Sequence, residues 1–165
     1  MKRTCLKAIV AASMLLAGTA FATTTSTTFE VTATVVDGCV ISATNHDFGV
    51  YTPSSPADNI NGVNTITATC TMSTLYDIGL DAGTGTGATA ASRKMTRVGG
   101  TETLEYSLYH TADRLVVLGN TLGADVISGV GTGVAVDHTV FGTIPAGQNV
   151  PSGSYTDTIT ATIDF

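Results

Sequence analysis

The sequence predicts an all-β protein of the immunoglobulin-like β-sandwich class. Short runs of alternating apolar and polar residues follow one another along the chain, separated by Gly, Asn, Asp, Pro and Ser. Thr is abundant, Trp is absent, and no long window shows apolar residues at helical spacing. Such strand-sized runs, with turn residues between them and one pair of cysteines in the exported part of the chain, are typical of a sandwich of two sheets.

The N-terminus has the pattern of a secretory signal peptide, residues 1–22. Lys2, Arg3 and Lys7 form a basic region, residues 8–16 form a short apolar core, and Ala20-Phe21-Ala22 is a small-residue cleavage site. The apolar core is too short to span a bilayer, which needs about 20 residues. We therefore expect an exported chain that begins at Thr23 and forms one domain.

The exported chain is acidic. Without residues 1–22 only four cations remain against 13 acidic residues, a net charge of 4 − 13 = −9. Nucleic acid is therefore not an expected partner, because binding it requires a basic surface. Three of the four cations, Arg93, Lys94 and Arg97, are clustered, and two interpretations remain open: a contact with an acidic face of a neighbouring subunit, or a charged edge that discourages wrong pairing.

Two cysteines, Cys39 and Cys70, remain after cleavage, because Cys5 leaves with the signal peptide. An even pair in an exported chain predicts a disulfide, which would close a loop of about 30 residues and stabilise the fold by roughly 3–4 kcal/mol. A metal site is the alternative, but two distant cysteines without a CxxC motif or a nearby histidine pair make a poor one.

The stretch 27–36 is predicted to be the first strand. Its apolar and polar residues alternate, and successive side chains of a strand point to opposite faces. The apolar face consists of Phe29, Val31, Ala33 and Val35. From the pattern alone, this face could pack on its own domain or on another molecule.

Four more strands are expected before residue 81: 39–41 after an Asp37-Gly38 turn, 46–51, 64–72 and 75–80. Residues 64–72 alternate strictly, which would turn Ile66 and Cys70 inward. Residues 52–64, rich in Pro, Asn and Gly, are expected to be loop and turn, and residues 81–88 a flexible glycine loop.

The second half of the chain predicts fewer strands. Residues 104–109 and 138–144 are expected strands, the former preceded by a turn at Gly99-Gly100. Residues 115–118 and 122–127 are ambiguous, residues 129–133 are expected to be a second glycine loop, and residues 145–151 the last turn.

Residues 155–165 are predicted to form one last strand with a mixed pattern of apolar residues and threonine. Its apolar face consists of Tyr155, Ile159, Ala161, Ile163 and Phe165. An amphipathic strand at each end of the exported chain leaves either a closed sheet or two open edges that could receive each other.

Several short motifs follow one another along the expected exported chain. They are the N-terminal alternating strand with Asp37-Gly38-Cys39, Phe48-Gly49, Thr69-Cys70, residues 106–109 leading to Ala112 and Arg114, residues 140–145, and residues 153–158 with the apolar face of the last strand. In this order, and over the whole exported chain, they resemble the spore coat protein U domain family, which includes the subunits of archaic, Csu-type chaperone–usher pili.

The resemblance implies an incomplete immunoglobulin-like sandwich that is completed by donor-strand complementation. Residues 23–36 would be an N-terminal donor extension with Phe29, Val31, Ala33 and Val35 as its plugs, and residues 37–165 the pilin domain. Tyr155, Ile159, Ala161, Ile163 and Phe165 would form one wall of the acceptor groove, where a periplasmic chaperone also pairs. The alternative is that 27–36 folds back as the first strand of its own domain.

Enzymatic and metal-binding interpretations have little support. His46, His110 and His138 are scattered, and no G-x-S-x-G elbow is present. The glycine loops lack the Lys and helix of a phosphate-binding loop. Asp58, Asn59, Asp77 and Asp81 lack calcium-loop spacing and are expected to be solvated loop residues. No catalytic residue, cofactor or metal is expected.

The predicted function is therefore a structural subunit of a surface pilus, exported through the periplasm. Its expected partners are other copies of itself or related pilins, a periplasmic chaperone and an outer-membrane usher, and the fibre would support adhesion and biofilm formation. The runner-up is a single-domain secreted binding protein of the same family, either an adhesin or a coat or matrix protein. A secreted hydrolase is a third hypothesis, which predicts turnover dependent on one His or Ser.

Overall fold

In a computed structural model, the structure describes residues 21–165, so most of the predicted signal peptide, residues 1–20, lies outside the described residues. Residues 35–165 form one compact unit. Residues 21–34 belong to a separate unit and contain no strand or turn, and their side chains are exposed. The strand expected over 27–36 is thus not formed in the single chain, because a strand's backbone groups need a partner strand.

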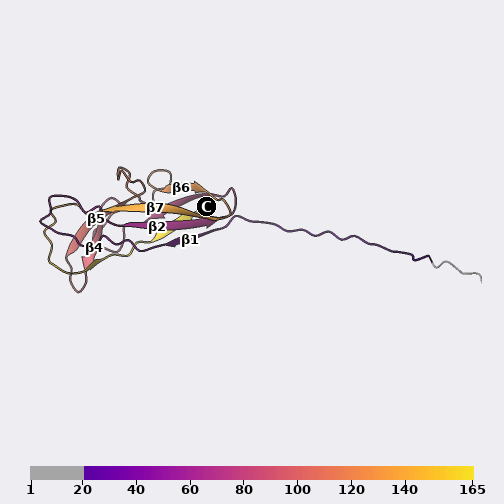
Figure 1. The fold of residues 1–165 in the computed structure, drawn as a ribbon, viewed down its shortest axis with the longest axis horizontal. Helices are drawn as coiled ribbons and strands as arrows, with labels where there is room; N and C mark the ends of the chain where they lie inside the picture. Colours follow the sequence, from indigo (N-terminus) through magenta and orange to yellow (C-terminus); the bar gives the residue numbers. More distant parts are fainter. Residues whose placement is uncertain (1–20) are drawn as a thin grey trace, which may run out of the picture. The chain divides into compact units, whose positions relative to one another are not determined.

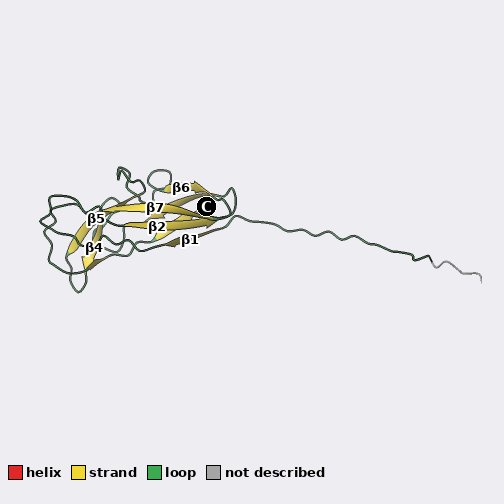
Figure 2. Cartoon of the chain, viewed as in Figure 1, coloured by secondary structure: helices red, strands yellow, loops and turns green. Residues whose placement is uncertain are grey.

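The compact unit is all-β, as predicted, and residues 21–165 contain no helix (Figures 1 and 2). Nine strands form two antiparallel sheets. The strands are β1 (Cys39–Ala43), β2 (Val63–Cys70), β3 (Leu75–Leu80), β4 (Arg93–Arg97), β5 (Thr103–Tyr109), β6 (Ile127–Val130), β7 (Ala135–Thr143), β8 (Tyr155–Thr156) and β9 (Ala161–Asp164). No helix in the described part of the chain is long and apolar enough to cross a membrane.

The larger sheet has the strand order β1-β2-β7-β5-β4-β8, and the smaller has the order β6-β3-β9. In the larger sheet, Ile66 of β2 stands opposite His138 of β7. In the smaller sheet, Ile78 of β3 stands opposite Ile163 of β9. Within the described residues, β1 pairs only with β2 and β9 only with β3, so each strand leaves one edge of its sheet unpaired.

The core lies between the sheets. It is built from the inward residues of strands in both sheets, as the period-2 patterns predict. Its largest fully buried apolar side chains come from β2 (Ile66), β3 (Ile78), β7 (Val140), the loop after β5 (Leu118) and the residue that follows β7 (Ile144). Tyr76 crosses this core to His138 of the other sheet, with 2.9 Å between its hydroxyl oxygen and Nε2.

Residues 46–51 were expected to be a strand and are not one, although Phe48 is buried. Gly49 has a φ of 66° and its N–H donates to the Asp47 carboxylate, which bends the chain. The side-chain amide of Asn59 donates to the backbone oxygens of Phe48 and Val50. A side chain therefore takes the hydrogen bonds that a partner strand would have made.

The predicted glycine loop at 129–133 is partly wrong, because Gly129 and Val130 belong to β6. Gly129 pairs with Tyr76 of β3, and a Cβ at this glycine would collide with the Tyr76 ring. The glycine is therefore required by an aromatic ring that packs over the strand.

The last predicted strand, 155–165, is split into β8 and β9. Thr156 of β8 pairs with Thr96 in the larger sheet, whereas Ala161 of β9 pairs with Leu80 in the smaller one. Alternation of burial nevertheless continues from Tyr155 to Ile163. The segment keeps one inward face while it passes from one sheet to the other.

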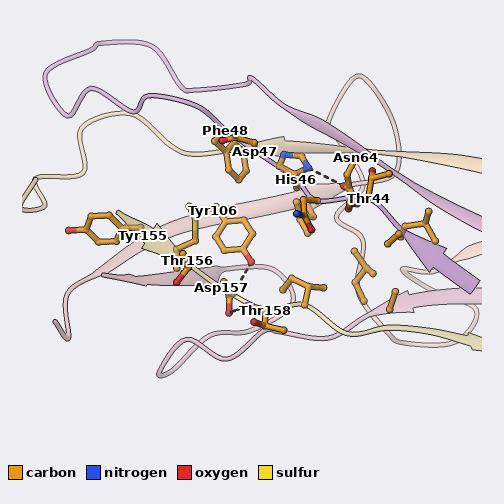
Figure 3. Close-up of a pocket in the computed structure, with 18 residues that line it drawn as sticks. Thr44, His46, Asp47, Phe48, Asn64, Tyr106, Tyr155, Thr156, Asp157 and Thr158 are labelled. Atoms are coloured by element: carbon orange, nitrogen blue, oxygen red, sulfur yellow. Dashed lines mark hydrogen bonds between the residues drawn. The ribbon is translucent and has the colours of Figure 1, made fainter. Parts of the chain in front are cut away.

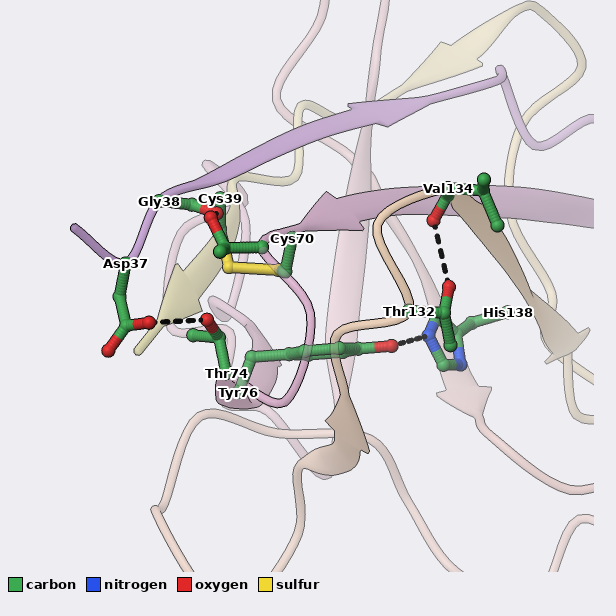
Figure 4. The surroundings of a disulfide bond; sticks show 10 residues. Asp37, Gly38, Cys39, Cys70, Thr74, Tyr76, Thr132, Val134 and His138 are labelled. Atoms are coloured by element: carbon green, nitrogen blue, oxygen red, sulfur yellow. Dashed lines mark hydrogen bonds between the residues drawn. A yellow bond between two sulfur atoms is a disulfide. The ribbon is translucent and has the colours of Figure 1, made fainter. Parts of the chain in front are cut away.

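The disulfide between Cys39 and Cys70 is present, with an S–S distance of 2.02 Å (Figure 4). It joins two directly paired residues at the ends of β1 and β2. Two further contacts extend this connection: the N–H of Thr71 donates to the oxygen of Gly38 at 2.9 Å, and the hydroxyl of Thr74 donates to the Asp37 carboxylate at 2.8 Å. The entry into β1 is thus tied to the turn after β2 by one covalent and two hydrogen-bonded links.

Candidate functional site

The compact unit has an open groove of about 670 Å³ between the segment that follows β1 and the segment that joins β8 to β9 (Figure 3). Residues 43–48 line one side, and Tyr155–Ile159 and Ala161 line the other. Its base consists of side chains from both sheets: Ile66, Leu80, Met95, Tyr106 and Leu108. A second cleft of about 630 Å³ shares five lining residues with it and continues toward residues 150–154; the shared residues are His46, Asp47, Phe48, Met95 and Tyr155.

Three of the five predicted acceptor residues, Tyr155, Ile159 and Ala161, line this groove. Ile163 instead packs, partly buried, against the core, and Phe165 is 62% exposed. The predicted donor residues lie elsewhere in the chain and are exposed, with Phe29, Val31 and Val35 more than 80% accessible. Their donor role stays a prediction.

Asp157 points into the groove from the same face as Tyr155 and Ile159 and is partly buried. The hydroxyl of Tyr106 donates to Oδ2 of Asp157 at 2.7 Å, as Figure 3 shows. The other oxygen, Oδ1, accepts from the N–H and the hydroxyl of Thr84, each at 2.8 Å, and from the N–H of Thr158 at 2.8 Å. Burial and this hydrogen bond to Asp157 raise the pKa of Tyr106, so the hydroxyl remains a donor.

Arg93 lies beneath this cluster and is 0% exposed. Its guanidinium donates to four backbone oxygens at 2.7–3.1 Å: those of Leu80, Asp81, Ala90 and Leu118. Burial lowers the pKa of Arg93, while Tyr106 and the acidic residues around it act in the opposite direction. The sequence grouped Arg93 with Lys94 and Arg97 as a basic cluster, but the structure removes Arg93 from the surface, because four backbone oxygens hold its guanidinium inside, and leaves Lys94 and Arg97 partly exposed.

His46 stands between the groove and its second cleft. Its Nδ1 lies 3.0 Å from Oδ1 of Asn64, which assigns the ring proton to Nδ1. The other nitrogen, Nε2, is buried and has no hydrogen-bond partner among residues 21–165. It faces Gly142, where a Cβ would collide with both His46 and the Phe48 ring. Burial lowers the pKa of His46, outweighing the effects of Asn64 and Asp47.

The folded unit is expected to lose stability as the pH falls through the ordinary histidine pKa of about 6.5. Burial also lowers the pKa of His138, so below that pH the unfolded chain binds more protons than the folded one. Urea-denaturation midpoints at pH 7.5, 6.5 and 5.5 should fall in that order, and less steeply in His46→Gln. A wild-type midpoint that stays level over this range would contradict the expectation.

Other site chemistries find no support in the described residues. No three His, Cys, Asp or Glu side chains between residues 21 and 165 are close enough to hold a metal ion. Within residues 21–165, His46 hydrogen-bonds to Asn64 and His138 to Tyr76, and neither ring hydrogen-bonds to a serine hydroxyl. The feature that the chain does present is a partly apolar groove beside two unpaired strand edges.

Three residues of the groove were not identified from the sequence as site residues: Asp157, Tyr106 and His46. Asp157 could have been found from the sequence, because it lies two residues from both Tyr155 and Ile159. In an extended strand it therefore shares their face. Tyr106 belongs to the strand expected over residues 104–109, but nothing in the sequence pairs it with Asp157. His46 has no such signal, because residues 46–51 follow no regular period in the structure.

Comparisons with known proteins agree with this architecture. The sequence model of the Spore Coat Protein U domain matches residues 25–162. "Protein U" of Myxococcus xanthus is 36% identical over 176 aligned positions, which cover 99% of this chain and 98% of that protein.

The fold is similar to a chain in the crystal structure of the CsuC–CsuE chaperone–tip adhesion subunit pre-assembly complex, from the archaic chaperone–usher Csu pili of Acinetobacter baumannii. The TM-score is 0.57 at 20% identity, so this likeness concerns the fold alone. The match covers 80% of this chain and spans only 40% of the Acinetobacter chain. The sequence match over most of the chain decides the family: this protein belongs to the Spore Coat Protein U domain family.

Proposed function

We propose that this protein is a structural subunit of a chaperone–usher type surface pilus, polymerised by donor-strand exchange. One observation carries the proposal: the compact unit has an open groove beside the unpaired edges of β1 and β9, and the same chain has an exposed, unpaired amphipathic segment at residues 27–36. Unpaired edges and a free strand-like segment on identical molecules are complementary. The family membership and the pilus-subunit fold support it.

In this proposal Phe29, Val31, Ala33 and Val35 of one subunit occupy the groove of the next. Burying these side chains contributes roughly 5–8 kcal/mol at about 25 cal/mol per Å². Ladder hydrogen bonds add about 1 kcal/mol each. The occupant would pack over side chains of the recipient's core at the base of the groove, among them Ile66, Leu80 and Leu108, so its removal would break these contacts together with the ladder, and the joint is expected to open slowly. A head-to-tail contact that does not close into a ring produces a filament.

Before assembly the groove has to be covered, and a periplasmic chaperone that pairs with residues 155–165 would do this. The solved structure with a similar fold is a chaperone–subunit complex of such pili, and this supports a chaperone as a partner. An outer-membrane usher would then deliver the subunit to the cell surface, after export directed by residues 1–22. Adhesion and biofilm formation would follow from the fibre, without an enzymatic role for the subunit.

The test is the size of the purified mature chain after removal of its chaperone. The wild type should form rod-like oligomers that resist detergent and dissociate on heating. A variant lacking residues 23–36, and one carrying Val31→Asp with Val35→Asp, should remain monomeric or chaperone-bound, because a buried unpaired carboxylate is costly. A peptide spanning residues 27–36 should stabilise both variants.

Thr32→Asp with Thr34→Asp is the matched control, since it adds the same charge to the other face of the same segment. This variant should still assemble. A wild-type chain that is a stable monomer, and that loses stability without residues 23–36 but gains none from added peptide, would show that the segment belongs to its own sandwich and would reject the proposal.

The second candidate is a single-domain coat, matrix or adhesin protein of the same family. The 36% identity to "Protein U" over nearly its whole length favours this alternative, because that relative also consists of one domain-sized chain. A coat protein or adhesin predicts binding of the monomeric chain to a cell surface, independent of Val31 and Val35. The double Asp variant therefore separates the two candidates.

A further inference from the structure

The segment 155–163, called here the acceptor wall, is not uniformly apolar. Its inward-facing residues, each two positions from the next, are Tyr155, Asp157, Ile159, Ala161 and Ile163. The carboxylate of Asp157 therefore stands between two apolar side chains, and Ala161 is the one small apolar side chain in the row. An occupant that pairs along this wall meets a polar position and a narrow side chain at fixed places.

The side chain of Asp157 is held in a defined position in the groove by its neighbours. Its four hydrogen bonds come from β5, from the loop 81–88 and from its own neighbour Thr158. Tyr106, which supplies one of them, is only 4% exposed. Gly83 packs against the carboxylate so closely that a Cβ there would collide with it. The surrounding structure thus holds the carboxylate in place and leaves it little freedom to turn away from an incoming side chain.

We propose that Asp157 sets the register of the donor segment by requiring its smallest apolar residue, Ala33, at the directly opposite position. This inference rests on the proposed function and deepens it. Opposite residues of an antiparallel pair have Cβ atoms about 4.5–5.5 Å apart on the same face. A valine or phenylalanine at that distance would be pressed against the carboxylate and strip it of water, whereas alanine leaves room beside it.

The antiparallel register that places Ala33 opposite Asp157 also matches the other positions. Val35 then faces Tyr155, Val31 faces Ile159, and Phe29 faces Ala161, so the largest donor side chain meets the smallest apolar wall residue. A shift by two residues in either direction would place Val31 or Val35 against Asp157. In the parallel orientation, Ala161 would face the donor's Asp37, and Phe29 would lie beyond the wall. The geometry therefore selects one register and one direction.

Cysteine pairs on the outward face test this register in the mature chain. With Ala33 opposite Asp157, Thr32 is opposite Thr158, and directly opposite residues have Cα atoms within disulfide reach. The variant Thr32→Cys with Thr158→Cys should give a ladder of covalent oligomers on non-reducing denaturing gels. The offset pairs, Thr34→Cys with Thr158→Cys and Thr32→Cys with Thr156→Cys, are the controls and should give about fivefold less, because diagonal neighbours lie roughly 7–8 Å apart.

The outcomes separate the register from the function on which it rests. A stronger ladder from either offset pair would overturn the register while leaving donor-strand exchange in place. Oligomers that form by size but show no covalent ladder with any pair would also overturn the register. Chains that never assemble would reject the proposed function and the register with it.

A second measurement addresses the cause of the register. Ala33→Leu should slow oligomer formation about tenfold or more, since the larger side chain has to be packed against the held carboxylate. Val31→Leu adds one methylene opposite Ile159 and should slow it far less. Asp157→Gly removes the carboxylate and should restore assembly of the Ala33→Leu chain. Equal effects of the two leucine variants, or no restoration, would refute the role of Asp157.

Discussion

Replacing Arg93 by methionine is expected to destabilise the compact unit by about 3–5 kcal/mol, a value typical of breaking a buried charged contact. The guanidinium is fully buried and holds four backbone oxygens from β3, from the loop before β4 and from the loop after β5. Methionine fills a similar volume but donates nothing, so these oxygens lose their donor in a place that water cannot easily reach. Urea denaturation of a chain that begins at Thr23, with wild type and variant compared in the same assembly state, measures the change.

Two controls identify the cause. Lys94→Met changes the next residue of β4, whose side chain makes no hydrogen bond in the structure, and should alter stability by less than about 0.5 kcal/mol. Arg93→Lys keeps the charge but offers a point-like ammonium in place of a planar fork, so it should recover only part of the loss. An Arg93→Met chain as stable as the wild type would mean that the four oxygens find other donors.

Removing the disulfide with Cys39→Ala and Cys70→Ala is expected to cost roughly 3–4 kcal/mol, since the bond closes a loop of about 30 residues. The bond also holds the first residue of β1, where the N-terminal segment enters the fold, against the last residue of β2. β1 has no other partner strand in the described residues, so its pairing should be the first to be lost. Denaturation midpoints of the oxidised wild type and the double variant measure the effect.

Reduction provides the matched comparison. A thiol reductant should lower the midpoint of the wild type toward that of the Cys39→Ala, Cys70→Ala chain and leave the double variant unchanged. A wild type that keeps its midpoint after verified reduction would show that packing alone holds β1 in place.

Much of this fold follows from period-2 alternation. The positions of β2, β3 and β5 agree closely with the strands expected at 64–72, 75–80 and 104–109, because each strand has one face in the core and one outside. The disulfide also followed from the sequence, since residues 23–165 contain only two cysteines, Cys39 and Cys70. A strand with one buried and one exposed face can therefore be located from its own residues alone.

The parts that were missed depend on contacts between distant residues. Nothing local distinguishes Gly129 in β6 from a loop glycine, because the Tyr76 ring that requires it is more than fifty residues away in the chain. Likewise, Arg93 appeared to belong to a basic cluster until the fold placed four backbone oxygens around it. The break between β8 and β9 arises because one half of the segment pairs with the larger sheet and the other half with the smaller one. The alternating pattern continues through the break, so it gives no information on which sheet each half joins.

The corner around Cys39 has a mechanical consequence. A pull on the N-terminal segment would reach the start of β1 at Asp37 and Gly38. There the hydroxyl of Thr74 and the disulfide connect the chain to the end of β2 (Figure 4), and the N–H of Thr71 adds a hydrogen bond to Gly38. Tension then passes to β2, which is paired along its length with β7, in place of peeling β1 from the sheet edge one hydrogen bond at a time. The disulfide therefore lets a force on the N-terminal segment act on β2 and its neighbour β7 as well as on the edge strand β1.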